Sequence, residues 1–309
     1  MDDQPIERWV AAGREALAAD HPGGALDPLR RALTQDPGHA VAHQLLALAL
    51  LRLHRPWAAL VEANAAILGD PESGETHAVL GDIQIARRDL RAATRHYEAA
   101  REFSPRAPAP LRGLAAVAAF DDDDAPALDL LREALALAPD DVETLVDVAR
   151  LHLTRNRLDE AARFAERALA VEPQHRAALC GKGFALLHRG DVAGAREHAA
   201  RALRRDPTHL DAIRLLAAVK ARESLALGLW FRANAAVSGL GPRAGALLVG
   251  AFVAQSLLRL GLQDLGHPVA GEAVRWLWLA ACLYSYVGPG LFRRLIEREI
   301  DAVALRGDD

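Results

Sequence analysis

Apolar and polar positions repeat along the first two thirds of the chain with a fixed period. Prolines stand at Pro37, Pro71, Pro105, Pro139, Pro173 and Pro207, and each step is 34 residues. Alanine occupies the position five residues before each of these prolines and the position twelve residues before it. The position twenty-four residues before each proline is always glycine or alanine. Such a regular period indicates an internal repeat. The repeat, rather than any single motif, therefore predicts the fold class.

Each unit has room for two helices of about 13 residues and two short turns. The proline marks where the second helix ends, because a helix interior does not accept it. We therefore predict an all-α chain with six repeats, over 6–39, 40–73, 74–107, 108–141, 142–175 and 176–209. A further helix over 210–224 is in phase with the earlier first helices. We expect this helix to cap the last apolar face of the array.

The pattern resembles the tetratricopeptide repeat. The first unit carries most of the motif in Trp9, Gly13, Ala25, Leu29, Ala32 and Pro37, and the third keeps Leu80, Gly81, Ala93, Tyr97, Ala100 and Pro105. The family's tryptophan position departs from the motif and reads His43, His77, Leu111, Leu145 and Leu179 in the later units. The resemblance implies a right-handed superhelical α-solenoid that binds proteins or peptides in a concave groove lined by the first helix of each unit.

The same resemblance predicts which side chains face that groove. They are Arg14, Gln44, Leu48, Arg52, Asp82, Arg112, Arg150, Phe184, His188 and Arg214, with Arg222 on the capping helix. The arginines favour a partner with acidic segments, because guanidinium groups bind carboxylates through paired hydrogen bonds. In the alternative interpretation they pair with nearby carboxylates such as Asp147, Glu143 or Glu75. The acidic run at 121–124 is interpreted as a solvated turn in which one aspartate caps the next helix.

Two segments near the C-terminal end are almost free of charge. Residues 244–262 and 274–292 are 19 residues long and contain one charged residue each, Arg259 and Arg275. A membrane span needs about 20 mainly apolar residues, so we predict a transmembrane helical hairpin over 244–299. An interfacial segment and linker precede it at 225–243, and a polar tail follows at 300–309. The stretches GLWFRANA and VGPGLFRRLIERE also resemble bacterial tetratricopeptide proteins that end in a hydrophobic hairpin.

Aromatic side chains near the ends of these segments are typical of a membrane interface. They are Trp230, Phe231, Trp276, Trp278, Tyr284 and Tyr286. Arginines gather on the outer ends of the hairpin, and this bias predicts a bacterial inner-membrane location with the repeats in the cytoplasm. Two alternatives remain open. The segments are buried helices of a cytoplasmic, soluble protein, or the hairpin lies in the plane of the membrane interface.

Composition and the absence of known motifs argue against several classes of function. The formal net charge is −4, so the chain carries no overall basic field that would attract nucleic acid. It has no phosphate-binding loop, nucleophile elbow or zinc-protease motif, and its histidines lack the spacing of a zinc site. We therefore expect no enzyme activity, no catalytic residues, no cofactor and no metal. The predicted function is a membrane-tethered scaffold or adaptor, and the alternative is a soluble scaffold or regulatory subunit whose C-terminal helices mediate oligomerisation.

Overall fold

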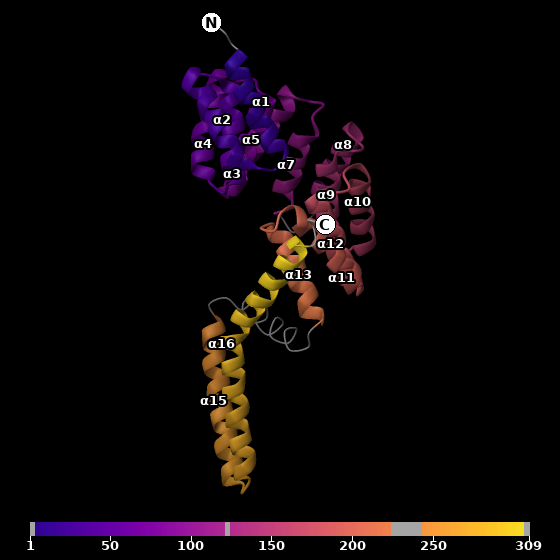
Figure 1. Ribbon diagram of the computed structural model, residues 1–309. Helices are drawn as coiled ribbons and strands as arrows, with labels where there is room; N and C mark the ends of the chain where they lie inside the picture. The colour runs from indigo at the N-terminus through magenta and orange to yellow at the C-terminus, as the bar shows by residue number, and fades with distance from the viewer. Residues whose placement is uncertain (1–3, 121–123, 224–242, 306–309) are drawn as a thin grey trace. The chain divides into compact units, whose positions relative to one another are not determined.

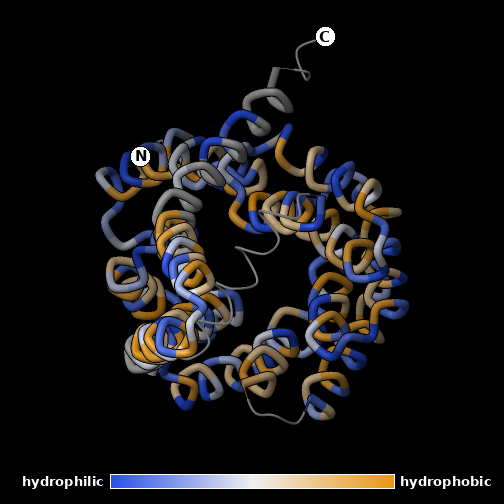
Figure 2. Tube along the Cα trace, turned by 90° about the horizontal axis from the view of Figure 1, so that it is seen from below, coloured by the Kyte–Doolittle hydropathy of each residue, from blue (hydrophilic) through white to orange (hydrophobic). Residues whose placement is uncertain are grey.

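The computed structural model describes residues 4–120, 124–223 and 243–305, and each regular element within these ranges is an α-helix. This confirms the all-α prediction. The chain divides into two compact units, residues 1–155 and 156–309, which are described separately (Figure 1). In Figure 2 the helices of the repeats carry both polar and apolar positions along their length, as expected for amphipathic helices that bury one face.

The first unit holds nine described helices arranged as successive pairs. They are α1 (Gln4–Ala18), α2 (Pro22–Gln35), α3 (Ala40–Arg52), α4 (Pro56–Gly69), α5 (Gly74–Ala86), α6 (Leu90–Phe103), α7 (Pro108–Ala118), α8 (Ala125–Leu137) and α9 (Val142–Thr154). The helices of a pair pack on each other, and each second helix also packs on the first helix of the next pair. The first helices α1, α3, α5, α7 and α9 pack directly on one another in sequence. Side chains on these first helices therefore meet across repeat boundaries.

The alanine positions form the centre of this packing. Ala25, Ala59, Ala93 and Ala127, each twelve residues before a proline, have no exposed surface. The alanines five residues before the same prolines are equally buried. A side chain of this size lets two helix backbones approach closely without a void, which is why a larger residue is excluded from both positions.

The tryptophan position is filled in two different ways. Leu111, Leu145 and Leu179 are essentially fully buried there. The histidines at this position instead reach back to the proline that ends the preceding repeat. The Nε2 atom of His43 lies 3.0 Å from the Pro37 carbonyl oxygen, and that of His77 lies 3.2 Å from the Pro71 carbonyl oxygen. Each imidazole ring can thus form a hydrogen bond with the proline carbonyl group, which a leucine side chain at the same position cannot do.

A position two residues after the repeat proline supplies the helix N-caps. His39, Ser73, Asp141, His175 and His209 each accept a hydrogen bond from the backbone N–H three residues later. An imidazole accepts such a bond only through an unprotonated ring nitrogen. Burial, followed by the nearby charge of Arg176, lowers the pKa of His209, and this keeps the ring nitrogen available as an acceptor. At the start of the second helix α8, Asp124 makes no side-chain capping hydrogen bond and pairs with Arg155, so Asp124 is not the helix cap predicted for the acidic run.

The second unit begins with four helices, α10 (Leu158–Val171), α11 (Arg176–Arg189), α12 (Val192–Arg205) and α13 (Leu210–Glu223). Helix α13 packs against α11 and α12, and it buries Leu215, Leu216 and Val219 there. Gly183 on α11 leaves the space that Leu215 occupies, since a Cβ atom added at Gly183 would lie 2.3 Å from the Leu215 Cδ2 atom.

Two longer helices follow, α15 (Arg243–Asp264) and α16 (Pro268–Leu305), and they pack side by side (Figure 1). In the part of the chain that the structure describes, no helix has the length and apolar content that crossing a membrane requires. The transmembrane interpretation of 244–262 and 274–292 is therefore not supported. Trp276 is exposed, and the Trp278 ring lies 6.2 Å from that of Phe252. Trp230 and Phe231 lie outside the described residues, and so do the side chains of Tyr284 and Tyr286.

Candidate functional site

The first helices α5, α7 and α9 bring together a line of charged side chains in the first unit. Asp82 on α5 and Arg150 on α9 hold the same repeat position, because they are separated by two periods of 34 residues. Arg112 stands on α7 between them. The three were predicted separately from the sequence. Asp147 contacts both Arg112 and Arg150, and Tyr97 contacts Asp82.

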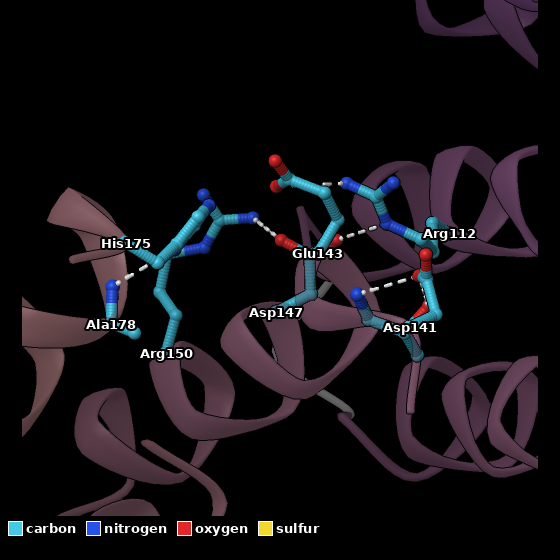
Figure 3. Close-up of polar contacts among 8 residues, drawn as sticks. Arg112, Asp141, Glu143, Asp147, Arg150, His175 and Ala178 are labelled. Atoms are coloured by element: carbon cyan, nitrogen blue, oxygen red, sulfur yellow. Dashed lines mark hydrogen bonds and ion pairs between the residues drawn. The ribbon is translucent and has the colours of Figure 1, made fainter. Parts of the chain in front are cut away.

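Asp147 on α9 holds the two arginines of this line. Its Oδ2 atom accepts a hydrogen bond of 2.9 Å from Arg112 Nε, and its Oδ1 atom accepts one of 2.7 Å from Arg150 Nη2. Arg112 also lies 3.5 Å from Glu143. Figure 3 shows the carboxylate of Asp147 between the two guanidinium groups. Burial disfavours the charge of Arg112, but Asp147 and Glu143 outweigh that effect, so the pKa of Arg112 is raised and the side chain stays protonated.

At the other end of the line, Tyr97 on α6 donates a hydrogen bond of 2.6 Å to Asp82 Oδ1. The Tyr97 ring is fully buried against Gly81 and Gly113, where an added Cβ atom would lie 2.5 Å and 2.1 Å from the ring. Asp82 is exposed on the surface, yet the surrounding helices desolvate its carboxyl group and raise its pKa, against the opposing effects of Tyr97 and Arg112. Burial and the Asp82 charge raise the pKa of Tyr97.

A pocket of about 340 Å³ lies beside these arginines. Its lining comes from α7, α8, α9 and the residues that follow α7 and α9: Arg112, Ala115, Ala116, Ala119, Phe120, Asp124, Leu131, Asp147, Arg150, Leu151, Thr154 and Arg155. The walls are apolar where the alanines and leucines meet, and polar where the arginines and aspartates stand. This volume is at the lower end of the range for ligand pockets, about 300–1,000 Å³.

Sequence reasoning missed this pocket, although the repeats contain the signal. The position of Ala119 is held by Leu17, Leu51, Ile85, Leu153 and Leu187 in the other five repeats. The fourth repeat also has a shorter first helix, since α7 has 11 residues where α5 and α9 have 13. In the fourth repeat, the methyl group of Ala119 therefore replaces a large apolar side chain, and α7 ends early beside it. The space that a leucine or isoleucine would fill stays open.

The other predicted groove residues make contacts within their own units. Gln44 is buried and donates a hydrogen bond of 3.1 Å to Glu75 Oε2. Arg52 donates a hydrogen bond of 2.8 Å to the Leu17 carbonyl oxygen. Leu48 packs against the core of the first unit, whereas Arg14 is exposed. In the second unit His188 is exposed, Phe184 is partly buried and Arg214 pairs with Asp211.

Comparisons with known proteins concern the repeats. A family model described as tetratricopeptide repeat matches residues 147–209. Among solved structures, the Cut9–Hcn1 hetero-tetramer of the APC/C is similar, with a TM-score of 0.56 and 17% identity over 68% of this chain. The match spans 42% of that chain. PilW, described as a type IV pilus biogenesis factor, matches with a TM-score of 0.51 and 17% identity, over 68% of this chain and 98% of PilW.

Curated proteins give no match to this sequence. At these identities the solved structures establish the fold alone, which is the helix-pair solenoid that the 34-residue period predicts. The family model reaches the same result from the sequence of the fifth and sixth repeats. This chain is therefore a protein with tetratricopeptide repeats.

Proposed function

We propose that this protein is an interaction scaffold that holds a segment of a partner protein on the first helices of its first unit. Tetratricopeptide proteins are protein-binding scaffolds, and the similar Cut9 structure is a complex with another protein, Hcn1. The observation that carries the proposal is the pocket beside Arg112 and Arg150, which combines apolar walls with preformed polar groups. Such a combination is typical of a binding site.

The line of side chains supports a role in positioning a ligand. Asp147 fixes both arginines through hydrogen bonds, so their guanidinium groups are held in place before a partner arrives. A group that is already ordered loses less conformational entropy on binding. Arg150 is also accessible, because 68% of its side-chain surface is exposed.

Photo-crosslinking in cells tests this proposal. A benzophenone amino acid is placed at Thr154, an exposed residue at the edge of the pocket, in the full-length chain. We expect it to capture a partner and give a discrete crosslinked band. The control carries the same amino acid at Leu68 on α4, which is 84% exposed on a second helix. A band that appears equally from Leu68, or no band from Thr154, would contradict a partner site on this face.

We further propose that the α15–α16 hairpin attaches this scaffold to a lipid surface. Large apolar side chains are exposed at many positions of both helices and of the turn between them: Phe252, Val253, Leu257, Leu258, Leu260, Leu265, Val269, Trp276, Leu277, Leu279 and Leu283. On α15 they point in several directions around the helix axis. A helix that is apolar on several sides is normally covered by protein or lipid.

Vesicle flotation tests the lipid proposal. The full chain is expected to float with vesicles of phosphatidylethanolamine and phosphatidylglycerol, and a chain lacking residues 225–309 is expected to stay at the bottom of the gradient. Oligomerisation through the hairpin is the alternative. It predicts a defined oligomer in light scattering without detergent and no flotation, and that result would overturn lipid attachment.

A further inference from the structure

We infer that the pocket at the end of α7 takes one branched aliphatic side chain of the partner, while Arg150 binds a carboxylate of the same segment. This inference rests on the proposed scaffold function and specifies the chemistry of its ligand. The ligand is an acidic segment with a leucine or isoleucine close to an aspartate or glutamate.

The aliphatic part follows from the repeat itself. The other five repeats place Leu or Ile at the position of Ala119, so the surrounding packing is built around a branched aliphatic side chain. Ala115, Ala116, Leu131 and Leu151 provide the apolar walls. Burial of such a side chain removes apolar surface from water and strengthens binding by about 10- to 100-fold. The partner thus supplies the group that the fourth repeat lacks.

The acidic part follows from the charges around the pocket. Among the residues that the structure describes, its lining contains three arginines, Arg112, Arg150 and Arg155, and two aspartates, Asp124 and Asp147, so the charge of these side chains is 3 − 2 = +1. Arg112 and Arg155 are engaged by Asp147 and Asp124 respectively. Arg150 contacts Asp147 through Nη2, and its remaining N–H groups are accessible on a side chain that is mostly exposed. A guanidinium group binds a carboxylate through two parallel hydrogen bonds.

The charge balance also disfavours a basic ligand. A lysine or arginine of a partner would have to compete with Arg112 and Arg150 for Asp147, which already accepts a hydrogen bond on each oxygen. Asp124 is similarly held by Arg155. A carboxylate meets no such competition at Arg150, because a guanidinium group carries five donors.

A phage-displayed library of random 12-residue peptides provides the probe. Panning against the full chain is expected to enrich sequences with Leu or Ile within three residues of Asp or Glu. An enriched peptide is then synthesised, and its Kd is measured by fluorescence anisotropy. The variants are Ala119→Leu, which fills the pocket with the residue of other repeats, and Arg150→Gln, which removes the charge.

We expect Ala119→Leu to weaken binding at least about tenfold, and Arg150→Gln to weaken it about 10- to 100-fold. Arg132→Gln is the matched control, since Arg132 is 72% exposed and pairs with Asp129 at 2.7 Å, as Arg150 pairs with Asp147, but it does not line the pocket. It should leave the Kd unchanged. A thermal melt of Ala119→Leu should show a midpoint no lower than that of the original protein, because five repeats already tolerate a large residue there.

Further results separate this inference from the proposed function. Exchanging the peptide's Asp for Asn should weaken binding to the original protein but have little further effect on Arg150→Gln. If enriched peptides lack acidic residues, or bind Ala119→Leu and Arg150→Gln normally, the inferred ligand chemistry is wrong. A crosslink from Thr154 together with that outcome would leave the scaffold function standing, whereas loss of the crosslink alone would contradict the scaffold function.

Discussion

Gly113→Ala is expected to lower the free energy of unfolding by about 2–4 kcal/mol, although alanine is the better helix former. The added Cβ atom would lie 2.1 Å from Cε1 of the Tyr97 ring. That ring is fully buried, and it also packs closely on the backbone of Gly81 in α5, where an added Cβ atom would lie 2.5 Å from the ring. The ring must therefore leave its place or push α7 away, and either change disturbs the hydrogen bond from Tyr97 to Asp82. The midpoint of urea unfolding, followed by circular dichroism, measures the effect.

Gly181→Ala is the matched control, because Gly181 holds the position of Gly113 two repeats later. The nearest atom to a Cβ added there is the Ala165 Cβ atom at 4.0 Å, an ordinary contact. Without a clash, only the helix preference of alanine remains, and it favours the folded state by up to about 1 kcal/mol. Equal midpoints for the two variants would show that Tyr97 is not confined between the two glycines.

Asp147→Ala is expected to cost about 2–3 kcal/mol of stability and to abolish binding at the pocket. The substitution removes two charge-assisted hydrogen bonds and leaves two guanidinium groups facing each other. Arg112 then keeps only the more distant Glu143, while 25% of its side-chain surface is exposed. The effect is larger than that of a surface ion pair, because water screens this arrangement less.

Asp129→Ala provides the comparison for that experiment. Asp129 pairs with Arg132 at 2.7 Å, the same distance as the Asp147–Arg150 pair, but both side chains are 72% exposed. Exposed pairs contribute about 0–1 kcal/mol, so this variant should unfold close to the original midpoint. If Asp129→Ala and Asp147→Ala shift the urea midpoint by the same amount, the line from Asp82 to Arg150 has no special energetic role.

Much of the fold could be predicted from the sequence because every repeat packs its two helices against each other through the same small residues. Alanine at two fixed positions and proline at a third indicate where helices touch and where they end. Ala25 and Ala32 are fully buried in the structure, as are their equivalents in the later repeats. The helix N-caps at His39, Ser73 and Asp141 also follow the period, two residues after each proline. None of these caps was predicted from the sequence, and histidine is an uncommon residue at a helix N-cap.

Hydropathy was less informative at the C-terminal end. The low charge of 244–262 and 274–292 indicates helices that avoid water on much of their surface. It does not show whether lipid, another protein or a second copy of the chain covers them. The structure describes α15 and α16 as a packed pair with exposed leucines such as Leu257 and Leu277. The sequence therefore indicated an unusual apolar surface, and the identity of its cover depends on interactions outside the chain.

The candidate site depends on the ways in which the repeats differ, and tertiary structure alone shows how those differences meet. Arg112 and Asp147 are 35 residues apart, and the packing of α7 on α9 places their side chains 2.9 Å from each other. Tyr97 reaches Asp82 only because Gly81 and Gly113 leave room for its ring. The sequence by itself determined the repeating backbone, since periodic small residues and prolines fix helix ends and helix spacing. The pocket and its fixed arginines were decided by contacts between unlike residues of neighbouring repeats, which a repeating pattern does not contain.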